Sequence, residues 1–467
     1  MQCSKGEHAE FFKFGAINVG YIGNKSEHES IILDHRPDDC FEKVIVNFTN
    51  LKKNNINTVE LEVFAIGRTK EFCGDRFIFA TGAKLHVHAF TLGNHHKFVW
   101  KNMNEVQYNN VITWGIHIFR TCDSVAHWLP DVFKTLEVFV GGLGTNPKIP
   151  FFGAKPPKYQ QKINVDFIEA GTGFRWKERK PYFLNLTSDE VKPGDFLAIT
   201  RFDGVDQIIQ YGAGSHSGHS AVVLEVDGVL SVVESQDGWY WPKHGIQRND
   251  WETWKKWALN ADFNVAVLPL SEESRKRFNV SAAEEFFKKK EGLPYGYHNF
   301  LFGWIDTPKD NYPPLLDPNF VLAAFSWLER IYEFPINRIL TQALNKRLGV
   351  TNRKISELTV MMAKKNMTFG DLMATPERDG WQYSDGESYV CSSFVAAVYR
   401  AGGLLINIEG TEMTPKDVYT LTIYDRNFNV PQKCKDNDPS LPYCQIMGNW
   451  LMELPGYSTI EQYPHMA

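Results

Sequence analysis

The sequence has no long apolar run, no large excess of charge of one sign and no low-complexity tract. The longest apolar stretches, such as FVLAAFSWL at 320–328, fall well short of the roughly 20 residues that a membrane-spanning helix needs. A formal net charge of −5 over 467 residues argues against a nucleic-acid-binding surface and against a polybasic membrane patch. No glycine-rich loop has the spacing of a phosphate-binding loop, so we expect no bound nucleotide and no cofactor.

The N-terminal stretch MQCSKGEHAEFF lacks the apolar core of a secretory signal peptide. The protein is therefore either cytosolic or a mature form, and the cysteines favour the mature form of a secreted or lysosomal protein, with a cytoplasmic protein as the alternative. Sequons of the form Asn-X-Ser/Thr favour secretion weakly, and we take each of them as a candidate glycosylation site. They lie at Asn24, Asn47, Asn185, Asn279 and Asn366.

The chain has seven cysteines, so at least one is left without a partner if the others pair. Cys434 and Cys444 enclose a loop rich in proline and aspartate, and a disulfide would stabilise such a loop. Two further bridges of unknown pairing could form among the N-terminal cysteines, which are Cys3, Cys40, Cys73 and Cys122. The alternative is seven reduced thiols in a cytosolic enzyme.

Composition divides the chain into two parts of different character. Residues 1–150 contain short alternating runs such as TVELEVFAIG and RFIFATG, which predict an accessory β-sandwich. Four prolines between Pro147 and Pro157 mark a boundary, and we expect a linker over 151–189. Residues 190–467 mix strand and helix patterns, with a helical insertion near 318–366. The expected architecture is a β-sandwich followed by an α+β domain.

Cys391 stands where a short helix should begin, in the stretch SYVCSSFVAAVYRAGG. Ser388 or Asp385 could cap that helix, and Gly402-Gly403 should end it. In a first helical turn, the unpaired N–H groups and the helix dipole favour the thiolate and could stabilise an oxyanion. The alternative is that Cys391 is a small buried apolar residue.

A predicted hairpin singles out one histidine as the base for this thiol. Asp227-Gly228 separates two β-rich runs, and with these two residues as the turn, His219, Glu234 and Gln236 share one sheet face. Gln236 lies directly opposite His219, and Glu234 is its diagonal neighbour. Either could accept the Nδ1–H of His219, and we expect Glu234 because a carboxylate also stabilises the imidazolium. The alternative is a solvated glutamate and a surface histidine.

Four motifs together resemble the permuted NlpC-type papain-like cysteine hydrolases, in particular their YiiX-like branch. They are KPGDFLAI, GHSAVVLEVDG with an acidic residue on the next strand, GLPYGYHNF and YVCSSFVAAVYRAGG, and they span roughly residues 190–425. The resemblance implies a circularly permuted papain-like fold with the chain order His, acid, Cys, and a site without metal. It assigns Cys391 as nucleophile, His219 as base and Glu234 as orienting residue.

The same resemblance assigns supporting roles outside this triad. It makes Gly194 and Asp195 a structural turn, and it lets Tyr295 line the substrate cleft or assist the oxyanion, as Gln236 also could. The N-terminal β domain resembles no family that we can name.

The expected function is hydrolysis of an amide or ester bond through a thioester acyl-enzyme, as in a peptidase or amidase. The substrate would be a peptide, an amide or an acyl lipid. A lipid-directed acyltransferase or phospholipase is the alternative, with the apolar segment FVLAAFSWLERIYEF as a lid. A second alternative is a binding protein with an inactive site.

Five tryptophans between Trp239 and Trp257 either wall the cleft or fill the core. His86 and His88 lack a placed third ligand, so we expect no metal.

Overall fold

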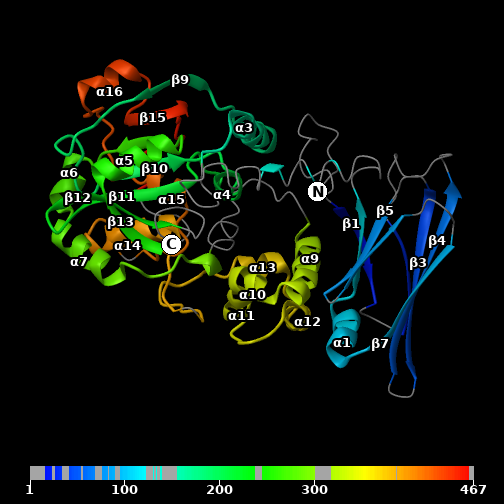
Figure 1. The fold of residues 1–467 in the computed structure, drawn as a ribbon. Coiled ribbons are helices and arrows are strands. Elements are labelled where there is room, and N and C mark those ends of the chain that lie inside the picture. Colours follow the sequence, from blue (N-terminus) through cyan, green and yellow to red (C-terminus); the bar gives the residue numbers. More distant parts are fainter. Residues whose placement is uncertain are drawn as a thin grey trace. The chain divides into compact units, whose positions relative to one another are not determined.

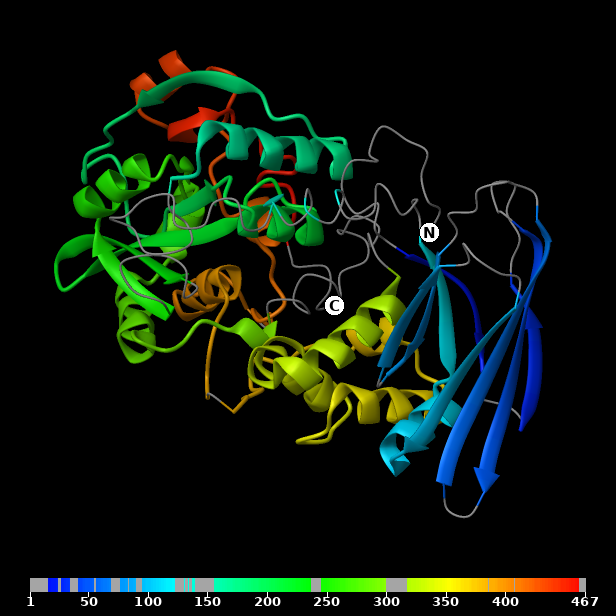
Figure 2. The ribbon, with the colours of Figure 1, turned by 45° about the vertical axis from the view of Figure 1, so that its right-hand side comes forward.

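The computed structural model divides the chain into two compact units. Unit 1 comprises residues 1–135 and 313–375, and unit 2 comprises residues 136–312 and 376–467 (Figures 1 and 2). The structure describes residues 16–121 except 24–26, 34–40, 54–55, 69–75, 83 and 90–94, four positions between 130 and 138, and residues 155–461 except 237–244, 300–316, 385 and 407. The four N-terminal cysteines, at 3, 40, 73 and 122, lie outside the described residues.

Unit 1 contains two four-stranded antiparallel sheets that share one apolar core. One sheet has the order β1 (Ala16–Ile22), β8 (Ile116–Thr121), β5 (Arg76–Thr81) and β6 (Lys84–Ala89). The other has the order β2 (His28–Ile32), β3 (Phe41–Lys53), β4 (Ile56–Arg68) and β7 (His95–Met103). Alternate residues of both sheets, such as Val46, Val63 and Ile118, meet in that core. The β-rich character expected for the N-terminal part is confirmed.

The helical segment belongs to unit 1, which differs from our expectation that residues 318–366 are an insertion in the catalytic domain. It comprises α9 (Pro318–Ile331), α10 (Glu333–Ile336), a π-helical turn (Asn337–Thr341), α11 (Gln342–Arg347), α12 (Ile355–Lys364) and α13 (Phe369–Met373). Asn110 Nδ2, in α1 (Glu105–Thr113), donates to Thr359 Oγ1 at 2.8 Å. Phe320 packs edge-on against Phe119, with ring centroids 5.4 Å apart. The apolar face of α9 is thus buried against strands about 200 residues earlier in the chain, a pairing that sequence proximity does not reveal.

Unit 2 is built on a seven-stranded antiparallel sheet. Its order is β13 (Gly245–Asp250), β12 (Val229–Gln236), β11 (His219–Val226), β10 (Phe196–Thr200), β14 (Asn264–Leu268), β15 (Cys444–Trp450) and β9 (Glu178–Phe183). The predicted hairpin is confirmed: Val226 pairs with Val229. The turn residues Asp227 and Gly228 have φ angles of 54° and 76°, which is the left-handed geometry that favours Asp-Gly in two-residue hairpins.

Helices of unit 2 surround this sheet (Figure 1). They are α3 (Lys158–Thr172), α4 (Val205–Ala213), α5 (Trp251–Asn260), α6 (Glu272–Arg277), α7 (Val280–Lys290), a 3-10 turn (Tyr297–Asn299), α14 (Cys391–Ala401), α15 (Pro415–Thr420) and α16 (Gln432–Asn437). The mixture of antiparallel sheet and helix confirms the expected α+β character. Residues 151–189 are not a plain linker, because they contain α3 and a strand, β9, that pairs with β15. Among the described residues, no helix combines the length and apolarity that a membrane crossing requires.

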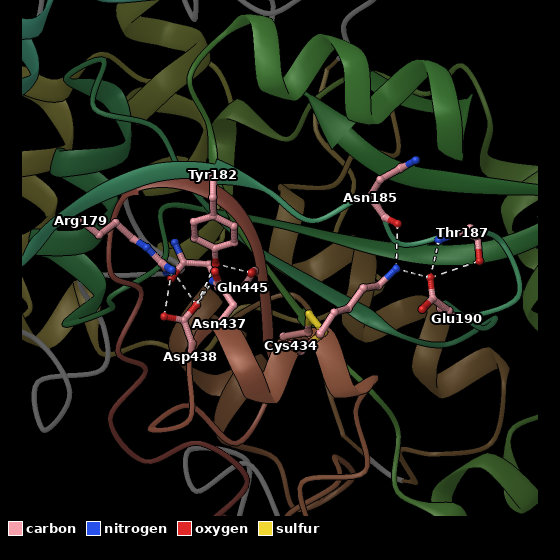
Figure 3. Close-up of a disulfide and its surroundings, with 11 residues drawn as sticks. Arg179, Tyr182, Asn185, Thr187, Glu190, Cys434, Asn437, Asp438 and Gln445 are labelled. Atoms are coloured by element: carbon pink, nitrogen blue, oxygen red, sulfur yellow. Dashed lines mark hydrogen bonds and ion pairs between the residues drawn. A yellow bond between two sulfur atoms is a disulfide. The ribbon is translucent and has the colours of Figure 1, made fainter.

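The expected disulfide between Cys434 and Cys444 is present and closes a loop of sequence separation 10. It ties α16 to β15, and both cysteines lie in the same apolar core as Val267, the strand partner of Cys444. Polar contacts flank it (Figure 3): Arg179 donates to both carboxylate oxygens of Asp438 at 2.8 Å. On the other side, Lys433 Nζ donates to Glu190 at 2.7 Å. A disulfide is compatible with the expected secretion.

We expect the double substitution Cys434→Ala with Cys444→Ala to lower the free energy of unfolding. A closed loop of this length restricts the unfolded chain by about 2–3 kcal/mol. Urea denaturation followed by circular dichroism measures the change. Dithiothreitol should destabilise the wild-type protein by about this amount more than it destabilises the double variant, which can lose only bridges among the N-terminal cysteines. Equal stability of the wild-type protein with and without the reductant would contradict the prediction.

Candidate active site

His219 and Glu234 form a buried hydrogen-bonded pair on the predicted hairpin. The distance from His219 Nε2 to Glu234 Oε2 is 2.8 Å, and both side chains are almost fully buried. The partner atom differs from our expectation, because Nε2 rather than Nδ1 faces the carboxylate. A carboxylate only accepts hydrogen bonds, so it fixes the tautomer with the proton on Nε2. The unprotonated Nδ1 is therefore the nitrogen able to act as a base.

Two further donors hold the carboxylate of Glu234. Gln236 Nε2 donates to Oε2 at 2.8 Å, and Trp254 Nε1 donates to Oε1 at 3.0 Å. Trp254 lies on α5 and packs with Trp251 in the core beneath the sheet. Of the five tryptophans in this part of the sequence, these two fill the core, and Trp239 and Trp241 lie outside the described residues. The donors keep Glu234 in a defined orientation next to the imidazole.

Cys391 is the first residue of α14, as the sequence predicts, and its side chain is fully buried. The N-cap is Val390, which provides no side-chain cap, whereas we expected Ser388 or Asp385 to cap the helix. Position 385 lies outside the described residues. The thiol lies against the backbone N–H groups of Ser220 and Ser392, which favour the thiolate. Ser220 directly follows His219 on β11, so the thiol lies against the backbone of the strand that carries the imidazole.

Burial opposes ionisation of both groups. It raises the pKa of the Cys391 thiol to about 11, which overrides the opposite expectation based on the helix N-terminus. Burial, followed by the positive charge of Arg201, lowers the pKa of His219 to about 4. Among the described residues, no hydrogen bond joins the Cys391 sulfur to the His219 ring. At neutral pH the pair is therefore a neutral thiol and a neutral imidazole.

Protonation of buried histidines is expected to lower the free energy of unfolding as the pH drops from about 6.5 towards 4, against an opposite contribution from Asp206, because burial raises the pKa of its carboxyl to about 7. Histidines of the unfolded chain bind protons in this range, whereas burial lowers the pKa of His219 and of His216 to about 4. Each of these shifts corresponds to about 3 kcal/mol of stability that is present above the unfolded-state pKa. Urea titrations between pH 4 and 8 measure this loss, and the substitution His219→Gln should remove part of it. An unchanged pH dependence in that variant would contradict the assigned cause.

The segment around Tyr295 lies against the chain that leads into α14. Tyr295 is buried and forms a parallel bridge with Tyr389, and the N–H of Gly296 donates to Tyr389 O at 2.9 Å. A Cβ atom at Gly296 would lie 2.9 Å from the carbonyl carbon of Tyr389, so this close approach requires glycine. Ser235 Oγ donates to the same Tyr389 oxygen at 2.7 Å. Both contacts position the start of the cysteine-bearing helix.

Gly194 and Asp195 form a structural turn, as the resemblance implies. Gly194 has a φ of +93°, and the carboxylate of Asp195 accepts from the N–H of Lys192 at 2.8 Å and pairs with Arg275.

Four of the five sequons lie among the described residues, and Asn24 does not. Asn185, Asn279 and Asn366 are exposed, and Asn47 is half-buried. Three of these side chains accept hydrogen bonds, and Asn47 Oδ1 accepts from Ser30 Oγ at 2.7 Å. Asn279 Oδ1 caps α7 by accepting from the N–H of Ala282, and Asn185 Oδ1 accepts from Lys255 Nζ at 2.6 Å. Glycosylation at the sequons stays a prediction.

Sequence reasoning missed a buried arginine beside the site. Arg201, which follows β10, forms an ion pair with Asp206, with Nη2 2.7 Å from Oδ1. Its Nη1 donates to Gln236 Oε1 at 3.3 Å. The only signal in the sequence is a charged residue that follows the apolar run FLAIT and precedes two aspartates. Gln236 is thereby engaged on both ends of its amide, rather than pointing towards a substrate.

Among the described residues, no group of three or more histidine, cysteine, aspartate or glutamate side chains could hold a metal ion. His86 and His88 have side chains outside the described set. No protein-family model, no curated protein and no solved structure matches this chain.

Proposed function

We propose that the protein is a cysteine hydrolase that cleaves an amide or ester bond, with Cys391 as nucleophile, His219 as base and Glu234 as orienting residue. One observation carries the proposal. A buried histidine whose tautomer is fixed by a carboxylate lies one residue from the backbone N–H that contacts a helix-terminal thiol. A fixed tautomer and a carboxylate partner are what a histidine base needs in nucleophilic catalysis.

The proposed reaction begins with proton transfer from the Cys391 thiol to Nδ1 of His219. The sulfur attacks the substrate carbonyl carbon, and the Cys391 N–H stabilises the resulting oxyanion, because N–H groups of a first helical turn lack intrahelical acceptors. His219 then protonates the leaving amine or alcohol, and a thioester forms on Cys391. Attack by water, assisted by His219, releases the acid and restores the thiol.

The proposal extends to fold, substrate and location. The order His219, Glu234, Cys391 along the chain, on a hairpin and a following helix, supports a circularly permuted papain-like domain in unit 2. We propose an amide or peptide substrate, with acyl lipids as the competing class, and a secreted or lysosomal location. Residues 318–366 belong to unit 1, so a lid formed by this segment would come from the other unit of the chain.

Trapping the acyl-enzyme tests the proposal even though the natural substrate is not identified. The protein is incubated with p-nitrophenyl acetate, a peptide-amide library and a phospholipid panel, and intact and peptide mass spectrometry locate the adduct. A thioester on Cys391 with release of product supports the hydrolase. Transfer to an added alcohol or amine in preference to water would favour an acyltransferase. Failure of every donor to modify Cys391 would favour a binding protein with an inactive site.

A further inference from the structure

We propose that Arg201 and Asp206 are positioning residues that act through Gln236 to hold Glu234 and His219 in the geometry of a base. The inference rests on the proposed function, because it concerns the same histidine. The inference gives a function to the buried Arg201–Asp206 ion pair, which takes no part in the proposed chemical steps.

A continuous chain of hydrogen bonds connects the ion pair to the imidazole. Asp206 Oδ1 accepts from Arg201 Nε at 3.1 Å and from Nη2 at 2.7 Å. Arg201 Nη1 then donates to Gln236 Oε1 at 3.3 Å, and Gln236 Nε2 donates to Glu234 Oε2 at 2.8 Å. The same Oε2 accepts from His219 Nε2 at 2.8 Å. Because the guanidinium can only donate, it fixes the orientation of the Gln236 amide, whose N–H then faces Glu234.

Burial holds the residues of this series of hydrogen bonds in fixed positions. Arg201, Asp206, His219, Glu234 and Gln236 each expose 3% or less of their surface. A buried polar group without a partner is costly, so each member holds the next in place.

The ion pair also packs directly against the residue before His219. A Cβ atom at Gly218 would lie only 2.4 Å from Asp206 Cβ, so glycine at 218 is required by the position of that carboxylate. Asp206 itself is anchored through Oδ2, which accepts from the Arg201 N–H at 2.7 Å. The backbone next to His219 therefore packs against the same ion pair that orients Glu234.

The charge of Arg201 acts on both reacting groups. It lowers the pKa of His219 and that of Cys391, so it favours a neutral imidazole and a more acidic thiol. Glu234 opposes the effect at His219, and Asp206 opposes it at Cys391. Asp203 Oδ2 lies 3.8 Å from Arg201 Nε, and burial raises the pKa of Asp206 to about 7 despite the opposing charge of Arg201. Removing the positive charge should therefore raise the pKa of His219.

The competing explanation is that the ion pair only stabilises unit 2. Gln236→Leu separates the two roles, because it interrupts the chain and leaves the Arg201–Asp206 pair intact. Arg201→Lys keeps the charge without the forked geometry, and Arg201→Gln removes both. Gln161→Leu is the matched control, because Gln161 is a buried glutamine on α3 whose Nε2 donates to Pro156 O at 3.0 Å.

The experiment measures the imidazole ¹⁵N shifts of His219 and the pH–rate profile of Cys391 alkylation by iodoacetamide. In Gln236→Leu we expect a mixture of His219 tautomers. Alkylation of Cys391 at neutral pH should be about tenfold slower, because one hydrogen bond to a charged group is lost. Arg201→Lys should show an intermediate effect, and Arg201→Gln, if folded, should raise the pKa of His219. Gln161→Leu should change neither readout.

Unchanged ¹⁵N shifts and an unchanged alkylation profile in Gln236→Leu and Arg201→Lys, with only a lower melting temperature, would overturn the inference. That result leaves the proposed function standing. If instead Cys391 is never acylated in the wild-type protein, the proposed function fails, and the ¹⁵N tautomer of His219 still decides whether the chain of hydrogen bonds positions the imidazole.

Discussion

Replacing Cys391 with alanine is expected to abolish acylation and to reduce hydrolysis by about 10⁴-fold or more, as for removal of a covalent nucleophile. The sulfur is the one protein atom in the proposed steps that bonds to the substrate carbon, so without it no acyl-enzyme can form. Stability at neutral pH should change only by the cost of the small cavity that the buried sulfur leaves, because no charge is removed. The burst of p-nitrophenolate from p-nitrophenyl acetate and the mass of the intact protein measure the loss.

Ser393→Ala provides a matched control for this substitution. Ser393 lies two residues along the same helix, is buried, and donates to Val390 O at 3.1 Å, but it takes no part in the proposed chemistry. A normal burst in Ser393→Ala with none in Cys391→Ala supports the assignment. Persistence of the burst in Cys391→Ala, or an adduct on another residue, would contradict it.

The predictable part of the site follows from periodicity and turn chemistry. Asp227-Gly228 set the hairpin register, and strict alternation along β11 and β12 then places His219 and Glu234 on one face. The helix beginning at Cys391 is equally predictable, since Phe394, Val395 and Val398 form an apolar face that ends at Gly402-Gly403. These features depend on local sequence alone.

The features that sequence analysis missed depend on tertiary burial. The apolar face of α9 is as compatible with one domain as with the other, and only packing against Phe119 assigns it to unit 1. The helix N-terminus favours a thiolate at Cys391, yet the desolvation of a fully buried sulfur outweighs it. Arg201 is adjacent to the site only because β10 lies beside β11 in the sheet. Long-range contacts of this kind leave little trace in a single sequence.

Removing the carboxylate of Glu234 is expected to have the largest effect on stability. In Glu234→Ala, three donors lose their acceptor: His219 Nε2, Gln236 Nε2 and Trp254 Nε1. Each buried donor without a partner costs about 1–3 kcal/mol, so we expect a loss of about 3–5 kcal/mol once the neighbours relax. Hydrolysis should fall by about 10⁴-fold in the variant Glu234→Gln, in which the amide no longer fixes the tautomer of His219. Urea denaturation and the burst assay measure the two effects separately.

Trp254→Phe separates the stability contribution of Glu234 from its role in orienting His219. This variant removes one donor to Glu234 Oε1 and leaves the bond between Oε2 and His219 in place. It should cost about 1–3 kcal/mol, the range for one lost hydrogen bond to a charged group, and retain most of the activity. If Glu234→Ala proved no less stable than Trp254→Phe, the three donors would not depend on the carboxylate. Equal activity of Glu234→Gln and the wild-type protein would mean that the carboxylate does not set the imidazole tautomer, and Glu234 would then be a structural acceptor in the core.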